Sequence, residues 1–244
     1  MLTVVLPYKD RDEQRLNNCL YTLFHQTVQP KVLLVDYGST PEFQKIVKKV
    51  TAEYASSSLY VPIENWKKTH ANNIGLKKVS TKYVLFSDVD MIYKPNFIET
   101  VLKMLEREKA IVTCKCSYLS KNETRGLIMP IDWKTYKPVI DQVSGETAVG
   151  ACLAMNTEWM QSIGGFDEKF SGWGREDVDV LCRAKSAKLC QIGIEESTSF
   201  FHQWHLPSDW KKDKEAITAN ARYFDEVTIK KQIIVRNQEG WGLL

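Results

Sequence analysis

The chain has 244 residues, of which 26% are charged and 43% hydrophobic, a size and balance typical of one globular α/β domain with a well-buried core. The formal net charge of +3 does not indicate binding to nucleic acid. The six cysteines form no CxxC pair, which is typical of reduced thiols in the cytoplasm. No apolar stretch has the length needed to cross a bilayer. We therefore expect a soluble, cytoplasmic protein, with peripheral membrane association left open.

Short apolar segments alternate with amphipathic ones, a pattern typical of a mostly parallel sheet flanked by helices. Apolar, β-rich runs predict strands at 3–6, 32–35, 59–61 and 83–87. Helical patterns lie between and after them, at 13–25, 41–54, 67–79 and 95–108. Farther along, strands near 111–114 and 149–155 flank a polar, aromatic stretch at 117–144, which we interpret as a loop-rich insertion.

The segment YVLFSDVD, residues 83–90, is an apolar run that ends in two acids. In extended backbone, side chains two residues apart point the same way, so Asp88 and Asp90 are predicted to lie together at the carboxyl end of a buried strand. Open α/β sheets bind ligands at that edge. Paired carboxylates suit Mg²⁺ or Mn²⁺ with a phosphate-bearing ligand, although a surface turn would also explain the two acids.

The first two strands end in LPYKDR and LLVDYGST, at the same edge of the predicted sheet. An aromatic ring, a carboxylate and an arginine there are apt for a nucleotide, through stacking, hydrogen bonding and charge pairing. Ordinary turns would account for each residue singly. Neither GxGxxG nor GxxxxGK[ST] is present, which disfavours a dehydrogenase or a P-loop enzyme. The residues gathered in this predicted crevice are Pro7, Tyr8, Arg11, Asp36, Gly38 and Ser39.

The segment GGFDEKFSGWGREDVDVLCRAK surrounds Trp173 with glycines and then takes up helical spacing. Glycines permit unusual backbone angles, so we expect a mobile loop that carries an aromatic platform. Glu176 and Asp177 fall in the first helical turn, where the helix dipole favours carboxylates. That preference explains the acids structurally, and a general base for a substrate hydroxyl explains them functionally.

The segment FFHQWH contains two of the four histidines of the chain, His202 and His205. A spacing of three residues lets both imidazoles reach one centre on a turn or a helix. Mixed histidine and aspartate ligands would favour Mn²⁺ over Mg²⁺. The alternative is that both histidines have a structural role.

Taken in order, PYKDR, DYGST, FSDVD, GWGRED and FHQWH resemble the motifs of GT-A glycosyltransferases, from residue 6 to about residue 210. The set is similar to that of family-two enzymes and of the β-1,4-galactosyltransferase and chondroitin-polymerase groups. The resemblance implies an α/β fold with a single Rossmann-like, mostly parallel sheet flanked by helices. Within one domain, 1–244, residues 1–115 would form the nucleotide-sugar-binding half. Residues 116–244 would form a looser acceptor-binding and catalytic half.

The resemblance also implies roles for individual residues. Asp90 would be the nearer metal ligand, with Asp88 on ribose or metal, and His205 and His202 would complete a Mn²⁺ or Mg²⁺ site. Asp177 matches the catalytic base of such enzymes.

On the substrate side, Glu176 would contact the acceptor or donor sugar, and Trp173 matches a loop tryptophan that contacts sugar. The segment HANNIG resembles ARNxG, which makes Asn73 a substrate-binding candidate. Two positions depart from the family pattern, since Asn72 replaces an arginine and Tyr37 replaces an acid.

The resulting hypothesis is a metal-dependent inverting transfer of a sugar from a nucleotide-sugar donor, with UDP favoured, to a hydroxyl of an oligosaccharide or glycolipid acceptor. Three alternatives remain. A retaining transferase uses the same scaffold. A sugar-nucleotide pyrophosphorylase would need a glycine-rich loop with a basic residue after the first strand, which LPYKDRDEQ lacks. A non-catalytic carbohydrate-binding module would not need the carboxylate pair, the histidine pair and GWGRED together.

Overall fold

The computed structural model describes residues 1–145, 149–206, 213–237 and 239–243. A seven-stranded sheet lies at its centre, in the order β10-β6-β9-β4-β1-β2-β3. Strands β1 (Leu2–Tyr8), β2 (Lys31–Tyr37), β3 (Ser57–Val61) and β4 (Tyr83–Phe86) run parallel, as do β6 (Ala110–Thr113) and β10 (Cys190–Gly193). Strand β9 (Leu153–Asn156) is antiparallel to β4 and β6, so the sheet is mostly parallel, as predicted.

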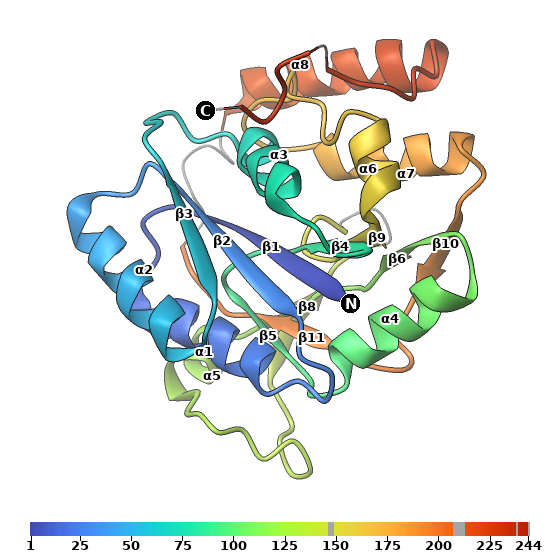
Figure 1. The fold of residues 1–244 in the computed structure, drawn as a ribbon. Coiled ribbons are helices and arrows are strands. Elements are labelled where there is room, and N and C mark those ends of the chain that lie inside the picture. Colours follow the sequence, from blue (N-terminus) through green and yellow to red (C-terminus); the bar gives the residue numbers. More distant parts are fainter. Residues whose placement is uncertain (146–148, 207–212, 238, 244) are drawn as a thin grey trace.

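Helices cover both faces of this sheet (Figure 1). One face carries α1 (Glu13–Phe24), α2 (Pro41–Glu53) and α4 (Phe97–Arg107). The other carries α3 (Lys68–Lys78), α6 (Thr157–Ser162) and α7 (Glu176–Ser186), with α8 (Lys214–Phe224) and the π-helix η2 (Asp225–Lys230) outside them. None of the helices described is both long and apolar enough to cross a membrane.

Side-chain alternation along β1 explains how one sheet supports two cores. Val4 and Leu6 are buried in the cluster formed with α1, α2 and α4, whereas Val5, between them, belongs to the cluster formed with α3, α6 and α7. Helix α3 approaches β1 closely because Gly75 has no side chain; a Cβ there would lie 2.4 Å from Val5 Cγ1.

The prediction of a loop-rich insertion at 117–144 is wrong in part. The segment contributes β7 (Ser117–Leu119), the short helix α5 (Lys121–Gly126) and β8 (Ile140–Val143). These two strands join β5 (Met91–Tyr93) and β11 (Phe200–His202) in a second sheet, in the order β5-β11-β7-β8. The short strands escaped prediction because they are completed by partners distant in the chain.

Strands from both predicted halves of the chain share the central sheet, since β9 and β10 lie beyond residue 115. The boundary at 115 therefore does not separate two structural layers. Instead, the second half completes the sheet and adds the elements that face its carboxyl edge.

Candidate active site

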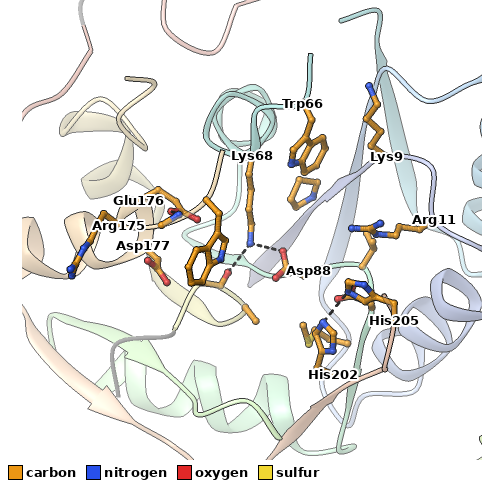
Figure 2. A pocket seen from close by; sticks show the side chains of 18 of the residues that line it. Lys9, Arg11, Trp66, Lys68, Asp88, Arg175, Glu176, Asp177, His202 and His205 are labelled. Carbon is orange, nitrogen blue, oxygen red and sulfur yellow. Dashed lines mark hydrogen bonds and ion pairs between the residues drawn. The ribbon is translucent and has the colours of Figure 1, made fainter. Parts of the chain in front are cut away.

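A cavity of about 680 Å³ lies where β1 and β4 end and α7 begins. Figure 2 shows side chains from widely separated segments directed into it. Most of the residues predicted from the sequence are brought together here. Those that line the cavity are Pro7, Arg11, Asp88, Asp90, Trp173, Glu176, Asp177, His202 and His205.

Three of these residues form a cluster suited to a metal ion. Asp90, His202 and His205 each offer a ligand atom, and the three atoms lie within 4.8 Å of one another. His205 Nε2 is 3.1 Å and His202 Nε2 is 3.7 Å from Asp90 Oδ2. Strand pairing produces this approach, because β11 runs antiparallel to β5 with His202 opposite Met91, the residue after Asp90.

The donor set fits a divalent cation. Asp90 is 5% exposed, and its Oδ1 has no hydrogen-bond partner among the described residues. Burial alone would raise the pKa of this carboxyl, but the His202 and His205 imidazoles and Arg11 outweigh it and hold the pKa below its usual value. One carboxylate and two imidazoles are ligands that Mn²⁺ accepts.

Asp88 does not join this cluster. The expectation that Asp88 and Asp90 point the same way assumed extended backbone, but β4 ends at Phe86 and the chain turns at residues 89–90 before β5. Asp88 Oδ1 instead lies 2.6 Å from Lys68 Nζ, at the start of α3 (Figure 2). The two acids of the motif therefore serve different parts of the cavity.

The acidic pair Glu176 and Asp177 opens α7 on the other side of the cavity. Arg175, in the left-handed region at φ 79°, turns the chain sharply into the helix. Glu176 Oε2 accepts a hydrogen bond from the Gly174 backbone N–H at 3.0 Å, and Asp177 Oδ1 accepts one from the Val178 N–H at 2.8 Å. Glu176 is thus held by an N–H of the loop before the helix, and Asp177 by one of the free N–H groups of the first helical turn.

Desolvation raises the pKa of both Glu176 and Asp177, and the negative charge of Asp177 raises that of Glu176 further. The Lys68 ammonium opposes both shifts. A carboxylate with a raised pKa is a stronger base, which suits proton removal from a hydroxyl.

Trp173 is 47% exposed at the rim of the cavity. Helix α8 holds its loop, because Asn220 Nδ2 donates to the Ser171 carbonyl at 2.8 Å and to the Trp173 carbonyl at 3.4 Å. The tryptophan therefore presents its ring to the cavity from an anchored backbone.

Four of the predicted nucleotide contacts do not line the cavity. Tyr8 is fully buried, and its hydroxyl donates to the Arg11 carbonyl at 2.7 Å. Asp36 accepts from the Ser39 N–H at 3.2 Å, and Ser39 Oγ accepts from the Asp10 N–H at 3.0 Å. Gly38, at φ 72°, is needed for packing, since a Cβ would lie 2.0 Å from the Ile63 carbonyl oxygen. These residues shape the turns that carry Arg11.

Asn73 also has a different role from the one expected. It is fully buried, and its Nδ2 donates to the Phe166 carbonyl and to Glu168 Oε1, both at 2.8 Å. Its Oδ1 accepts from the Phe166 N–H at 2.8 Å. All its hydrogen-bonding atoms are occupied within the protein, so Asn73 ties α3 to the loop before α7 and does not face the cavity.

Tyr37, which departs from the family pattern, is 2% exposed. Its hydroxyl lies 2.8 Å from His70 Nδ1, and its ring meets Trp66 edge-on at 5.8 Å between centroids. The substituted tyrosine therefore supports the cavity wall through Trp66.

Sequence reasoning missed several lining residues. Trp66 precedes α3 and Lys68 is its first residue, and no sequence pattern marks either of them as functional. The packing of α3 on β1 brings both to the cavity. Lys9 follows Tyr8, and its ammonium donates to the Glu64 carbonyl. Tyr118 comes from β7 and packs against His202, with ring centroids 4.9 Å apart.

Comparison with known proteins supplies the class that this fold and cavity define. Residues 3–164 match glycosyl transferase family 2, and residues 136–205 match the N-terminal domain of galactosyltransferase. The motifs recognised in the sequence lie within these matched regions. Residues 207–210, the last of the segment that resembles the family, lie outside the described structure. The chain belongs to glycosyl transferase family 2.

Two curated relatives show the range of this family. Glycosyltransferase GlyA of Streptococcus pneumoniae is 30% identical over 59% of this chain and 20% of that protein. Validoxylamine A glucosyltransferase of Streptomyces hygroscopicus subsp. limoneus is 24% identical over 74% of this chain and 47% of that protein. The chain thus spans less than half the length of either relative.

Solved structures share the fold. GalNAc-T7, determined with UDP, GalNAc and Mn²⁺, has a TM-score of 0.71 at 12% identity, over 93% of this chain and 48% of that one. TarS of Staphylococcus aureus has a TM-score of 0.64 at 16% identity, over 92% of this chain and 39% of that one. The predicted α/β fold of the GT-A type is confirmed.

Proposed function

We propose that this domain is a metal-dependent, inverting glycosyltransferase that moves a sugar from a nucleotide-sugar donor, with UDP favoured, to a hydroxyl of a glycan acceptor. One observation carries the proposal: a single cavity holds the Asp90, His202 and His205 cluster on one wall and the Glu176 and Asp177 carboxylates on another. Family membership and Mn²⁺-bound structural neighbours with UDP or with GDP-mannose support it.

The metal would be held by Asp90, His202 and His205. When bound, a divalent cation supplies positive charge that offsets the negative charge of a diphosphate leaving group. Arg11, whose charge acts on Asp90, and Lys68, which is paired with Asp88, line the same cavity and add positive charge to it. Trp66 and Pro7 line it as well, and the Trp66 ring suits stacking on a base.

On the opposite wall, Asp177 removes the proton from the acceptor hydroxyl. The hydroxyl oxygen then forms a bond to the anomeric carbon while the bond from that carbon to the diphosphate breaks. The proton ends on the Asp177 carboxylate, and the electron pair of the broken bond leaves with the nucleotide. Because attack and departure take place on opposite faces, the anomeric configuration inverts. Trp173 provides a ring face for the acceptor sugar, and Glu176 a hydrogen-bond acceptor.

A screen of nucleotide sugars with Mn²⁺ tests this proposal by measuring released nucleoside diphosphate. We expect turnover with a UDP-sugar, and Asp177→Asn should reduce it by about 10²–10⁴-fold, the usual contribution of a positioned base. Asp141→Asn is the matched control, an exposed acid on β8 that does not line the cavity.

Two experimental results would contradict this proposal. A product that retains the donor's anomeric configuration would establish a retaining transferase, and silence with every donor would favour a carbohydrate-binding module. The cytoplasmic location and the oligosaccharide or glycolipid acceptor stay predictions.

A further inference from the structure

Gly150 lies between two charged residues of the cavity. It belongs to the segment before β9, and its carbonyl oxygen is 3.4 Å from Lys68 Nζ. The same ammonium is 2.6 Å from Asp88 Oδ1, a contact drawn in Figure 2. Lys68 therefore fixes the position of the Gly150 peptide relative to α3.

The α-carbon of Gly150 faces Asp177. A Cβ placed on Gly150 would lie 3.0 Å from Asp177 Oδ2 and 3.5 Å from both Asp177 Cβ and Cγ. Gly150 is not among the glycines with positive φ, so its backbone angles do not require glycine. What requires a small residue here is the space occupied by the Asp177 carboxylate.

The Asp177 carboxylate is thus confined from two sides. Its Oδ1 accepts the Val178 N–H at 2.8 Å, which ties it to the first turn of α7. Its Oδ2 lies against Gly150, whose backbone is also among the groups that lower the pKa of the Asp177 carboxyl. One contact belongs to the helix and the other to the strand segment, so together they restrict rotation of the side chain.

We propose that Gly150, anchored by Lys68, is a positioning residue that sets the orientation of the Asp177 carboxylate toward the acceptor hydroxyl. The inference rests on the proposed function, because it concerns the base of that reaction. Proton transfer requires the base within hydrogen-bonding distance of the hydroxyl, and misplacement by a fraction of an ångström reduces the rate. Because Gly150 has no side chain, it leaves the space that Asp177 Oδ2 occupies.

Gly150→Ala tests the proposal by placing a methyl group against Oδ2. The carboxylate must then move by a few tenths of an ångström, and we expect hydrolysis of the UDP-sugar identified by the screen, with water as acceptor, to slow by about tenfold. Gly126→Ala is the matched control, since a Cβ there meets no atom within 4 Å. The Mn²⁺ concentration for half activity should not change in either variant.

A double-mutant cycle separates positioning from general damage. If Gly150 acts through Asp177, then Gly150→Ala should cause no further loss of kcat in an Asp177→Asn background, where the base is already absent. The proposal is overturned if Gly150→Ala matches Gly126→Ala, or if its loss is fully additive with that of Asp177→Asn. Partial unfolding of Gly150→Ala would lower kcat by the same factor in both backgrounds, which is a fully additive loss. A positioning role predicts no loss in the Asp177→Asn background, so the cycle distinguishes positioning from partial unfolding.

The proposed function can fail separately. If Asp177→Asn turned over its donor as fast as the unsubstituted protein, the base assignment would be wrong whatever Gly150→Ala did. If Asp177→Asn lost activity and Gly150→Ala did not, only the positioning role of Gly150 would be lost.

Discussion

At the residue scale, the cavity separates its charged groups by function. Asp90 Oδ2 faces two imidazoles, whereas Asp88 is paired with Lys68. Glu176 and Asp177, on α7, are instead held by backbone N–H groups. Substitutions at these positions should therefore affect metal binding and proton transfer independently.

His205→Ala should weaken metal binding. The variant loses one of the three proposed ligands, so we expect the Mn²⁺ concentration for half activity to rise by about tenfold or more, equivalent to about 1.4 kcal/mol. His25→Ala is the control, because His25 is exposed and does not line this cavity. A Mn²⁺ titration of activity measures the change, and an unaltered midpoint in His205→Ala would indicate a structural histidine.

Asp177→Asn should stabilise the protein near neutral pH while abolishing most of its activity. Desolvation raises the pKa of Asp177, so the folded protein holds this proton more strongly than the unfolded chain does. Ionisation therefore costs folding free energy as the pH rises through the folded-state pKa, and an amide avoids that cost. Asp177→Asn is therefore expected to raise the free energy of unfolding at neutral pH and to leave it unchanged at acidic pH.

Melting temperatures from pH 4 to pH 8 measure this effect. The difference between Asp177→Asn and the unsubstituted protein should shrink as the pH falls toward about 4, where carboxyls of the unfolded chain also take up protons. A lower melting temperature for Asp177→Asn at pH 7 would contradict the expectation. It would mean that the Val178 N–H contact contributes more than the desolvation of the carboxylate costs.

At the scale of elements, buried ion pairs fix α7 against the C-terminal segment. Asp179, on α7, is fully buried and lies 2.8 Å from Arg183 Nε and 2.9 Å from Arg236 Nη2. Arg236 Nε is also 3.0 Å from Asp167 Oδ2, in the loop that Asn73 holds. This network locates the start of α7, and with it Glu176 and Asp177.

Arg236→Met should destabilise the fold by about 3–5 kcal/mol, because it removes the counter-ion that faces buried Asp167 and one of the two that face buried Asp179. Lys230→Met is the control: its ion pair with Asp225 is 2.8 Å long but the lysine side chain is 63% exposed. Such a pair contributes at most about 1 kcal/mol. Chemical denaturation compares the two variants, and equal losses would rule out the buried network as the main tie on α7.

At the scale of the whole molecule, ligand binding should be visible as stability. A ligand that binds only the folded state stabilises it by about 2.7 kcal/mol at a hundredfold excess over Kd. We expect UDP to raise the melting temperature in the presence of Mn²⁺ and much less in EDTA. Asp90→Ala should lose the Mn²⁺-dependent part of the shift, and a larger shift with GDP than with UDP would change the donor assignment.

Much of the fold is a local property of the sequence. Strands β1 to β4 are short β-rich runs, and helices α1, α2 and α4 each have an apolar face, so their order follows from side-chain periodicity. Helix α3 lacks such a face, because it buries polar residues such as Asn72 and Asn73 together with apolar ones. The acids at the start of α7 are also readable locally, because they follow a glycine-rich loop and precede helical spacing. The sequence by itself therefore determined the α/β class and nine of the residues that line the cavity.

Tertiary packing decided which of those residues act together. The register of β11 on β5, with His202 opposite Met91, sets the histidines beside Asp90. The close approach of α3 to β1 at Gly75 delivers Lys68 to Asp88. Periodicity is fixed by neighbouring residues, whereas strand register and helix approach depend on contacts between segments far apart in the chain. For that physical reason the structure was needed to divide the cavity into the walls proposed for the metal and for the base.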